Sequence, residues 1–405
     1  MTSTACRVFR TAVCIAALLI ATRAAAQAIP SEPLTFGDGR VVVSGDAAVA
    51  FAPKDDGFFN YSSYEQTTLR QVRFGMTAYV RLSDRFSVLG ELRSENFEYV
   101  TPFALYARIR PLPNRRLDLQ VGRIPPTFGS FSRRSYGHDN PLIGSPVAYQ
   151  YLTSLRPDSV PADLDELVRM RGRGWLSAFS IGDRVGHPGV PLVSAFTWDT
   201  GLQLSTGWNM VTAAVGITNG TSSDPRVSDD NAGKQVSLRT TVTPATGLIV
   251  GASFARGEFL DRHIRPLLSN PDAHDFDQRA AELDVEYSRD HWLARAELMR
   301  SEWTLPIGTA GAVMPLRSLA TTFEGRYTFA PGWYGAARVE HLGFSQITTP
   351  TQTTEWEAPV TRTEVGIGYY VQRNLIAKTS LQFNRRDGGR ITRSQLLAAQ
   401  LLYWF

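Results

Sequence analysis

The sequence predicts an all-β protein, a transmembrane antiparallel up-and-down β-barrel of sixteen strands that closes on itself. Three observations predict this fold. Segments of about ten residues alternate between apolar and polar side chains along most of the chain, as barrel strands do. The connections between these segments alternate between very short and long. The polar face of the segments carries many charges, which must line water because lipid does not solvate them.

The first residues have the features of a secretory signal peptide. Arg7 and Arg10 precede an apolar run over 12–21, and small alanines follow up to residue 26. The apolar run is too short for a membrane-spanning helix. We therefore expect residues 1–26 to be removed and residues 27–405 to form the barrel.

Composition excludes several classes of protein and site. Both cysteines, Cys6 and Cys14, lie in the signal segment, so the mature chain offers neither disulfides nor thiolate metal ligands. Without Arg7, Arg10 and Arg23, the 42 basic residues fall to 39 against 38 acidic ones, and a nearly neutral chain has no bulk attraction for nucleic acid. No later apolar run approaches the roughly 18 to 20 residues of a membrane helix, which excludes a helical membrane protein.

Sixteen segments have the alternation of barrel strands: a first strand, seven pairs joined by short turns, and a last strand. Turn residues such as Pro244–Gly247 and Ala330–Gly332 favour these hairpins. A further strand over 174–181, with a turn at 199–201, would raise the count to eighteen, and the sequence leaves this alternative open. The predicted strands are 41–51, 67–82, 86–96, 101–110, 117–123, 193–205, 210–218, 234–243, 248–256, 279–287, 292–300, 318–329, 333–342, 361–371, 375–384 and 393–405.

The short connections all lie on one side, the side on which the chain ends. A soluble sandwich would have short turns at both ends of its sheets. Aromatic residues gather on the apolar face next to the short turns, as in the interfacial girdle of a membrane barrel. These residues are Phe86, Tyr287, Trp292, Phe329, Trp333, Tyr403 and Phe405.

The last predicted strand, Arg393–Phe405, has one apolar face that includes Leu401, Tyr403 and Phe405. A final amphipathic strand that closes on an aromatic residue resembles the C-terminal strand of Gram-negative outer-membrane porins. The resemblance implies a location in the outer membrane, among its lipid and lipopolysaccharide. It also implies passive passage of small hydrophilic solutes and a homotrimer.

One connection, over Ile124–Leu192, is far longer than the rest, and loops of such length usually have a function. In general porins the loop after the fifth strand folds into the lumen, so the resemblance implies a constriction here. The flank Leu119–Gly129, LQVGRIPPTFG, resembles the strand-to-loop passage of phosphate-selective porins. Within the loop, Leu164, Leu167 and Val168 share one face of a predicted short helix.

Charged residues on the polar face and in the long loop are the candidate pore-lining set, because fixed charge at a constriction decides which ions pass. In the loop the candidates are Arg156, Asp163, Asp165, Glu166, Arg169 and Arg171, and on the strands they are Arg73, Arg108, Arg239, Arg295, Arg326 and Arg338.

The cationic sites are almost all guanidinium groups. After the signal segment the only lysines are Lys54, Lys234 and Lys378, and guanidinium suits carboxylate and phosphate. This favours a weak preference for anions. The lumen has no one-sided basic excess, however, which argues against a dedicated phosphate channel. The alternative is that many of these charges form neutralising ion pairs on the barrel wall.

The sequence has no nucleophile elbow, phosphate-binding glycine loop or histidine pair at metal spacing, so we expect no catalytic site, cofactor or metal. An acidic stretch, Asp272–Asp277, has ligands that suit calcium, but such loops are more often simply solvated. The predicted function is therefore a porin and not an enzyme. Two alternatives remain: a barrel enzyme with a hydrolase site at the outer rim, and a secreted glycan-binding β-protein.

Overall fold

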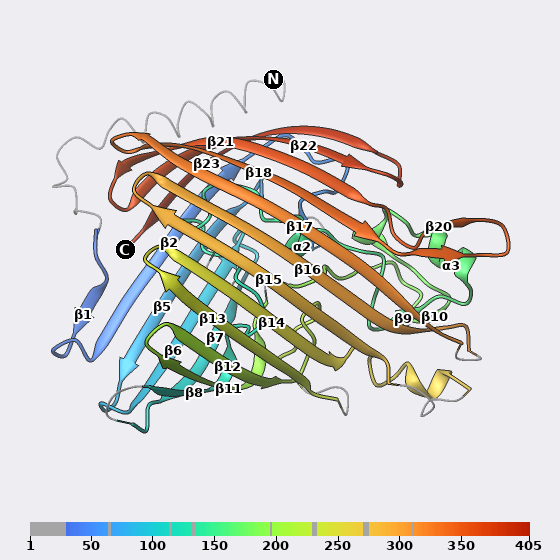
Figure 1. The fold of residues 1–405 in the computed structure, drawn as a ribbon, viewed down its shortest axis with the longest axis horizontal. Coiled ribbons are helices and arrows are strands. Elements are labelled where there is room, and N and C mark those ends of the chain that lie inside the picture. Colours follow the sequence, from blue (N-terminus) through green and yellow to red (C-terminus); the bar gives the residue numbers. More distant parts are fainter. Residues whose placement is uncertain are drawn as a thin grey trace, which may run out of the picture.

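A computed structural model describes residues 30–405 except 64–65, 113–115, 132–133, 195–196, 229–232, 270–274 and 310–311. The predicted signal peptide lies outside the described residues. Sixteen antiparallel strands, each paired with its neighbours in chain order, form one barrel (Figure 1). They are β2 (Val41–Phe51), β5 (Val72–Arg81), β6 (Phe86–Glu95), β7 (Tyr99–Ile109), β8 (Leu117–Ile124), β11 (Asp199–Trp208), β12 (Val211–Thr218), β13 (Gln235–Ala245), β14 (Leu248–Glu258), β15 (Asp277–Arg289), β16 (Trp292–Ile307), β17 (Ala312–Ala330), β18 (Trp333–Phe344), β21 (Val360–Gln372), β22 (Leu375–Arg386) and β23 (Arg393–Trp404).

The barrel closes because its first strand pairs with its last. β2 pairs with β23 on one side and with β5 on the other, which leaves no open edge. At the seam, Gly45 and Phe405 exchange two backbone hydrogen bonds of 3.1 and 2.9 Å. A Cβ atom on Gly45 would lie 2.8 Å from the Phe405 ring, so glycine makes room for that ring. The last predicted strand therefore forms, and it closes the barrel against the first.

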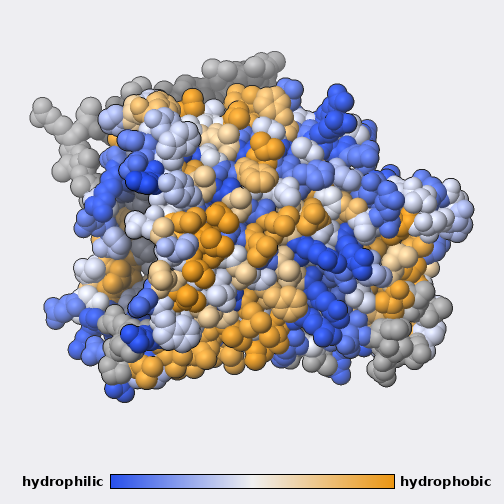
Figure 2. All heavy atoms as spheres, viewed as in Figure 1, coloured by the Kyte–Doolittle hydropathy of each residue, from blue (hydrophilic) through white to orange (hydrophobic). Residues whose placement is uncertain are grey.

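Side chains alternate between the outside and the lumen along each strand. On β17, Leu319 and Phe323 are exposed to the outside, whereas Thr322 and Glu324 are buried inside. Figure 2 shows hydrophobic residues over the middle of the barrel wall and hydrophilic ones toward the strand ends. At the short-turn end the exposed rings pair, with centroids of Trp333 and Tyr369 4.4 Å apart. The structure therefore confirms the predicted all-β barrel.

The strand count is sixteen, and the structure corrects several predicted boundaries. The sixth strand begins at Asp199 instead of Val193, so the long loop covers residues 125–198. Residues 174–181 add no barrel strand: they contain η2 (Gly174–Leu176), and β10 (Ile181–Gly182) pairs only with β9 (Ser159–Val160) inside the loop. In the described part of the chain no helix is long and apolar enough to cross a membrane.

The long loop enters the barrel with its first half and leaves it with its second. Its helix α2 (Val147–Gln150) lies inside the barrel, whereas α3 (Leu164–Arg169) lies at the long-loop end beside β20 (Thr353–Glu355) (Figure 1). Loop side chains such as Phe131 share a buried apolar cluster with Trp303 and Leu342 of the wall. The barrel thus has a core on its inner face, to which the loop, the wall and the outer connections all contribute.

Candidate functional site

Carboxylates of the wall hold the first half of the long loop inside the lumen. The backbone N–H of Gly144 donates to Glu364 at 3.0 Å, and that of Val147 donates to Glu340 at 2.8 Å. Both carboxylates are buried, and a buried charge is tolerated only when it is paired and hydrogen-bonded. These contacts tie the start of α2 to β18 and β21.

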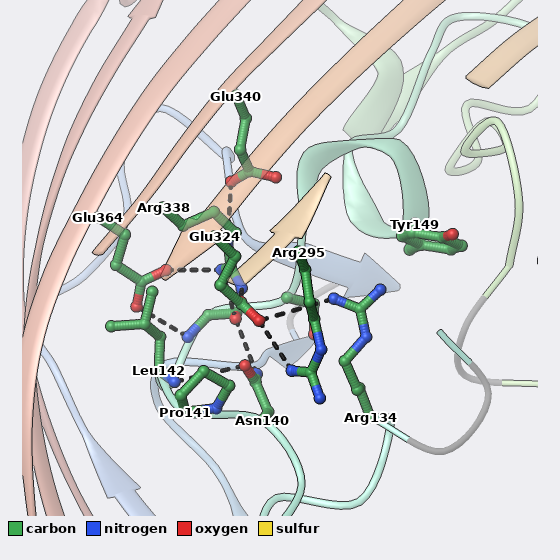
Figure 3. Close-up of polar contacts among 12 residues, drawn as sticks. Arg134, Asn140, Pro141, Leu142, Tyr149, Arg295, Glu324, Arg338, Glu340 and Glu364 are labelled. Carbon is green, nitrogen blue, oxygen red and sulfur yellow. Dashed lines mark hydrogen bonds and ion pairs between the residues drawn. The ribbon is translucent and has the colours of Figure 1, made fainter. Parts of the chain in front are cut away.

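An arginine–glutamate network continues from these carboxylates (Figure 3). Glu324 of β17 lies at its centre and accepts from Arg295 at 2.9 Å and from Arg338 at 3.0 Å. Arg338 also donates to Glu364 at 2.8 Å and to Glu340 at 3.2 Å. Because Arg338 is fully buried, three carboxylates balance a charge that water does not reach.

The loop contributes its own arginine to this network. Arg134 pairs with Glu297 and lies 3.8 Å from Glu324. The hydroxyl of Tyr149 in α2 donates to the same Glu297 at 3.1 Å. The charges of the wall and those of the loop therefore neutralise each other around Glu297 and Glu324.

Further along the wall, cations bind the carbonyl groups of the loop. Lys378 of β22 donates to Gly137 at 2.5 Å and to Asn140 at 2.6 Å. Arg362 of β21 donates to the Ser145 carbonyl at 3.0 Å. Both cations are buried. The wall formed by β17, β18 and β21 to β23 is thus covered by the loop, and we call it the filled side of the lumen.

On the opposite wall the loop leaves space. An inner cavity of about 800 Å³ lies between loop residues 125–139 and strands β11 to β16, and it reaches the short-turn end of these strands. Arg239 and Asp284 line it and form two hydrogen bonds of 2.9 Å. Both Arg295 and Glu297 also line it, at the border of the network. We call the wall of β11 to β15 the open side.

Two smaller cavities continue along the open side toward the long-loop end. One has a volume of about 20 Å³ and lies where β11, β12 and β13 meet the two ends of the loop. The other, of about 440 Å³, lies between loop residues such as Arg156 and His187 and the outer connections that contain Asp224 and Asp261. Together with the inner cavity they follow one wall of the barrel.

The six strand arginines predicted to line the pore have different surroundings. Arg239 and Arg295 line the inner cavity, and Arg338 is buried in the network. Arg73 donates to the Ser135 carbonyl at 3.2 Å and therefore also holds the loop. The two others are Arg108, paired with Asp118 at 2.5 Å, and Arg326, whose guanidinium lies 5.6 Å from the Tyr334 ring.

The predicted acidic helix forms, and its charges contact groups near the outer rim. Asp163 caps α3 by accepting from the N–H of Glu166 at 2.7 Å. The Glu166 carboxylate accepts from Ala162 at 2.6 Å. Asp165 accepts from the Thr351 hydroxyl at 3.1 Å. These carboxylates therefore lie beside the outer loops, away from the inner cavity that Arg239 lines.

The three loop arginines differ in their surroundings. Arg156 is buried and donates to both oxygens of Asp158, at 2.8 and 2.7 Å, while it lines the outer cavity. Arg171 donates to Glu355 at 3.5 Å, whereas Arg169 is exposed. Their influence on permeating ions stays a prediction.

The second half of the loop is fastened by Glu357, which follows β20. Its carboxylate accepts from the N–H groups of Ser154 at 2.7 Å and Gly172 at 2.5 Å. Burial raises the pKa of the Glu357 carboxyl above its usual value, although these N–H donors act against the shift. Sequence reasoning did not single out Glu357 or Arg134, because their partners are far away in the chain.

No metal site emerges from the described residues, among which no group of three or more histidine, cysteine, aspartate or glutamate side chains is placed to hold an ion. Part of the acidic stretch Asp272–Asp277, residues 272–274, lies outside the described ranges.

Comparisons with known proteins show similarity in fold and none in sequence family. No family model matches the chain, and no curated protein sequence matches it. OmpF of Salmonella typhi, solved in complex with daunomycin, is 11% identical over 92% of this chain and 100% of that chain, with a TM-score of 0.57.

Two further solved structures are similar at the same level. An anion-selective porin from Comamonas acidovorans is 10% identical over 90% of this chain and 99% of that chain, with a TM-score of 0.51. The trimer form of OmpT, an outer membrane protein of Vibrio cholerae, is 11% identical over 90% of this chain and 99% of that chain, also with a TM-score of 0.51. With its closed sixteen-strand barrel and its inward loop after the fifth strand, the chain has the fold of Gram-negative outer-membrane porins.

Proposed function

We propose that this protein is an outer-membrane channel through which small hydrophilic solutes and ions diffuse passively. One observation carries the proposal: a closed barrel that is apolar outside encloses cavities lined by polar and charged groups. The polar lumen supports this function, because water and small solutes can enter a polar interior that lipid does not fill.

The proposed surroundings are the lipid and lipopolysaccharide of the outer membrane of a Gram-negative bacterium. The exposed apolar band and its rings at the short-turn end support this location, since such rings sit at the headgroup level. A homotrimer is the proposed assembly, and the trimer form of OmpT of Vibrio cholerae supports it by fold alone.

A weak preference for anions belongs to the same proposal. The inner cavity is lined by three arginines, Arg134, Arg239 and Arg295, and by four carboxylates, Asp139, Asp284, Glu286 and Glu297, so the fixed charges nearly balance. The Comamonas acidovorans protein of similar fold is anion-selective by its description. We propose the same sign of selectivity for this chain and a small magnitude, because each lining arginine has a carboxylate partner.

Reconstitution of the purified barrel in planar bilayers tests the proposal. We expect steps of current in potassium chloride and a reversal potential, under a salt gradient, displaced slightly toward the anion value. Hydrolysis of lipid or peptide substrates by the same preparation would favour the barrel enzyme instead. A protein that yields no current steps and releases no dye from vesicles would contradict the channel.

A further inference from the structure

The three cavities on the open side form a series. The outer cavity shares Ser194, Thr197 and Pro225 with the small one. The small cavity shares residues 125–127 with the inner one. Shared lining residues place the three cavities next to one another along the open side. We call the 20 Å³ cavity, which lies between those of 440 and 800 Å³, the neck.

The wall of the neck is lined by hydroxyl and amide groups. Gln235 of β13 donates to the Thr218 hydroxyl at 3.1 Å and accepts from the Ser222 hydroxyl at 2.9 Å. Ser237 lies two residues further along the same face of β13. Such groups can both donate and accept hydrogen bonds, so they replace water around a neutral polar solute.

Formal charge in the neck is small and already engaged. Among the described residues that line it, Asp199 alone carries a charge. Its carboxylate accepts from the backbone N–H groups of Thr200 at 2.8 Å, Gly220 at 3.0 Å and Arg226 at 3.1 Å. Three donors satisfy most of its accepting capacity, so little remains for a passing cation.

The loop side of the neck is apolar and seated firmly on the wall. Phe128 and Val193 line it, next to two consecutive prolines at 125–126. A Cβ atom on Gly216 of β12 would lie 2.4 Å from the Thr127 hydroxyl oxygen and 2.7 Å from that of Ser237. The missing side chain therefore lets Thr127 approach the wall, where it donates to Gln203 at 2.8 Å.

We propose that this neck is the filter of the channel and that it favours small uncharged solutes with hydroxyl or amide groups over ions. The inference rests on the proposed function and specifies its substrate class. An ion would leave part of its water behind in the neck and meet no free opposite charge. A neutral polyol or amide would exchange water for the hydroxyls of Ser222 and Ser237 at little cost.

The size of the neck sets a second condition. At about 20 Å³ the neck is the narrowest of the three cavities, so we expect it to admit the smallest polar solutes most readily. Glycerol and urea are suitable probes, because they are small, uncharged and rich in hydrogen-bonding groups.

The test places the same bulk at two points of one strand face. Ser237→Trp fills the neck, whereas Thr241→Trp, four residues along β13 on the same lumen face, adds a tryptophan to the wide inner cavity. Full-length barrels are reconstituted, and glycerol and urea entry is followed by vesicle swelling. We expect Ser237→Trp to lose most of the wild-type flux and Thr241→Trp to keep most of it.

A third variant keeps the neck open and changes its charge. Ser237→Asp should raise the permeability of potassium relative to chloride and lower the ratio of glycerol flux to ionic current. It also covers the case in which the tryptophan variant does not assemble.

Several results would overturn the filter. Unchanged flux through Ser237→Trp would mean that the passage lies elsewhere, and equal losses in both tryptophan variants would mean that the neck has no special role. A wild-type barrel that conducts ions but excludes glycerol and urea would contradict the substrate class while the channel itself stands. A wild-type barrel without any flux would overturn the proposed function as well.

Discussion

The filled and open sides of the lumen use the same residue types for different purposes. On the filled side, Arg338 is fully buried and Lys378 nearly so, and both bind the loop or its carboxylate partners. On the open side, Arg239 pairs with Asp284 but still borders a cavity. Position on the polar face therefore does not decide whether a charge meets solutes. The path of the long loop decides it, because the loop covers one wall and leaves the other free.

The largest effect is expected at the seam that holds both sides together. Deleting Phe405 removes its two backbone hydrogen bonds to Gly45 and the ring beside it, so the first and last strands should fail to close. We expect a large loss of heat-modifiable barrel in the membrane fraction. Phe97→Ala, which changes an exposed ring in an outer connection, is the control and should assemble normally. Normal assembly without Phe405 would show that closure does not depend on this contact.

This part of the fold could be predicted from the sequence. The strand count and the closing strand follow from alternation with a period of two and from turn residues, which are local signals. The predicted alternation of short and long connections is wrong between β6 and β7, which only residues 96–98 join at the outer end. The short helix α3 was also predictable, since the apolar face of Leu164, Leu167 and Val168 is a local pattern. Its place near Thr351 was not, because it depends on contacts between segments far apart in the chain.

The division of the charged residues could not be predicted for the same reason. Arg239 and Arg338 both follow the inward alternation of their strands and look equivalent in sequence. Only the path of residues 134–150, which pack on one wall, makes the first a cavity residue and the second a buried one. The volume of the neck likewise depends on how Thr127 meets Gly216 across space.

The second prediction compares one arginine from each side. Arg338→Ala leaves Glu324, Glu340 and Glu364 without their central partner, and breaking a buried ion pair costs about 3 to 5 kcal/mol. The loop should detach from the wall, with lower stability in urea and a larger, noisier conductance. Arg239→Ala should cost less, because it removes the partner of one carboxylate, Asp284, at a cavity border and leaves the loop contacts of the filled side intact. Equal losses of stability in the two variants would remove the distinction between the sides.

The third prediction concerns selectivity and is smaller. Arg239→Ala should move the reversal potential toward cations, because it uncovers Asp284 in the inner cavity. Neutralising Asp163, Asp165 and Glu166 together, as amides, should move it toward anions by less, since these groups are held at the outer rim. Planar bilayers under a salt gradient measure both shifts. A larger shift from the α3 variant would restore this helix as the constriction.

The most direct test asks which wall solutes touch. Residues 27–405 contain no cysteine, so single cysteines can report on access to each side. Thr241→Cys lies on the open side, in the inner cavity, and Ser380→Cys lies on β22 of the filled side, where the serine is 2% exposed. A membrane-impermeant, charged thiol reagent should change the current through the Thr241 variant and leave the Ser380 variant unaffected. Modification of the Ser380 variant with no change at Thr241 would contradict the account.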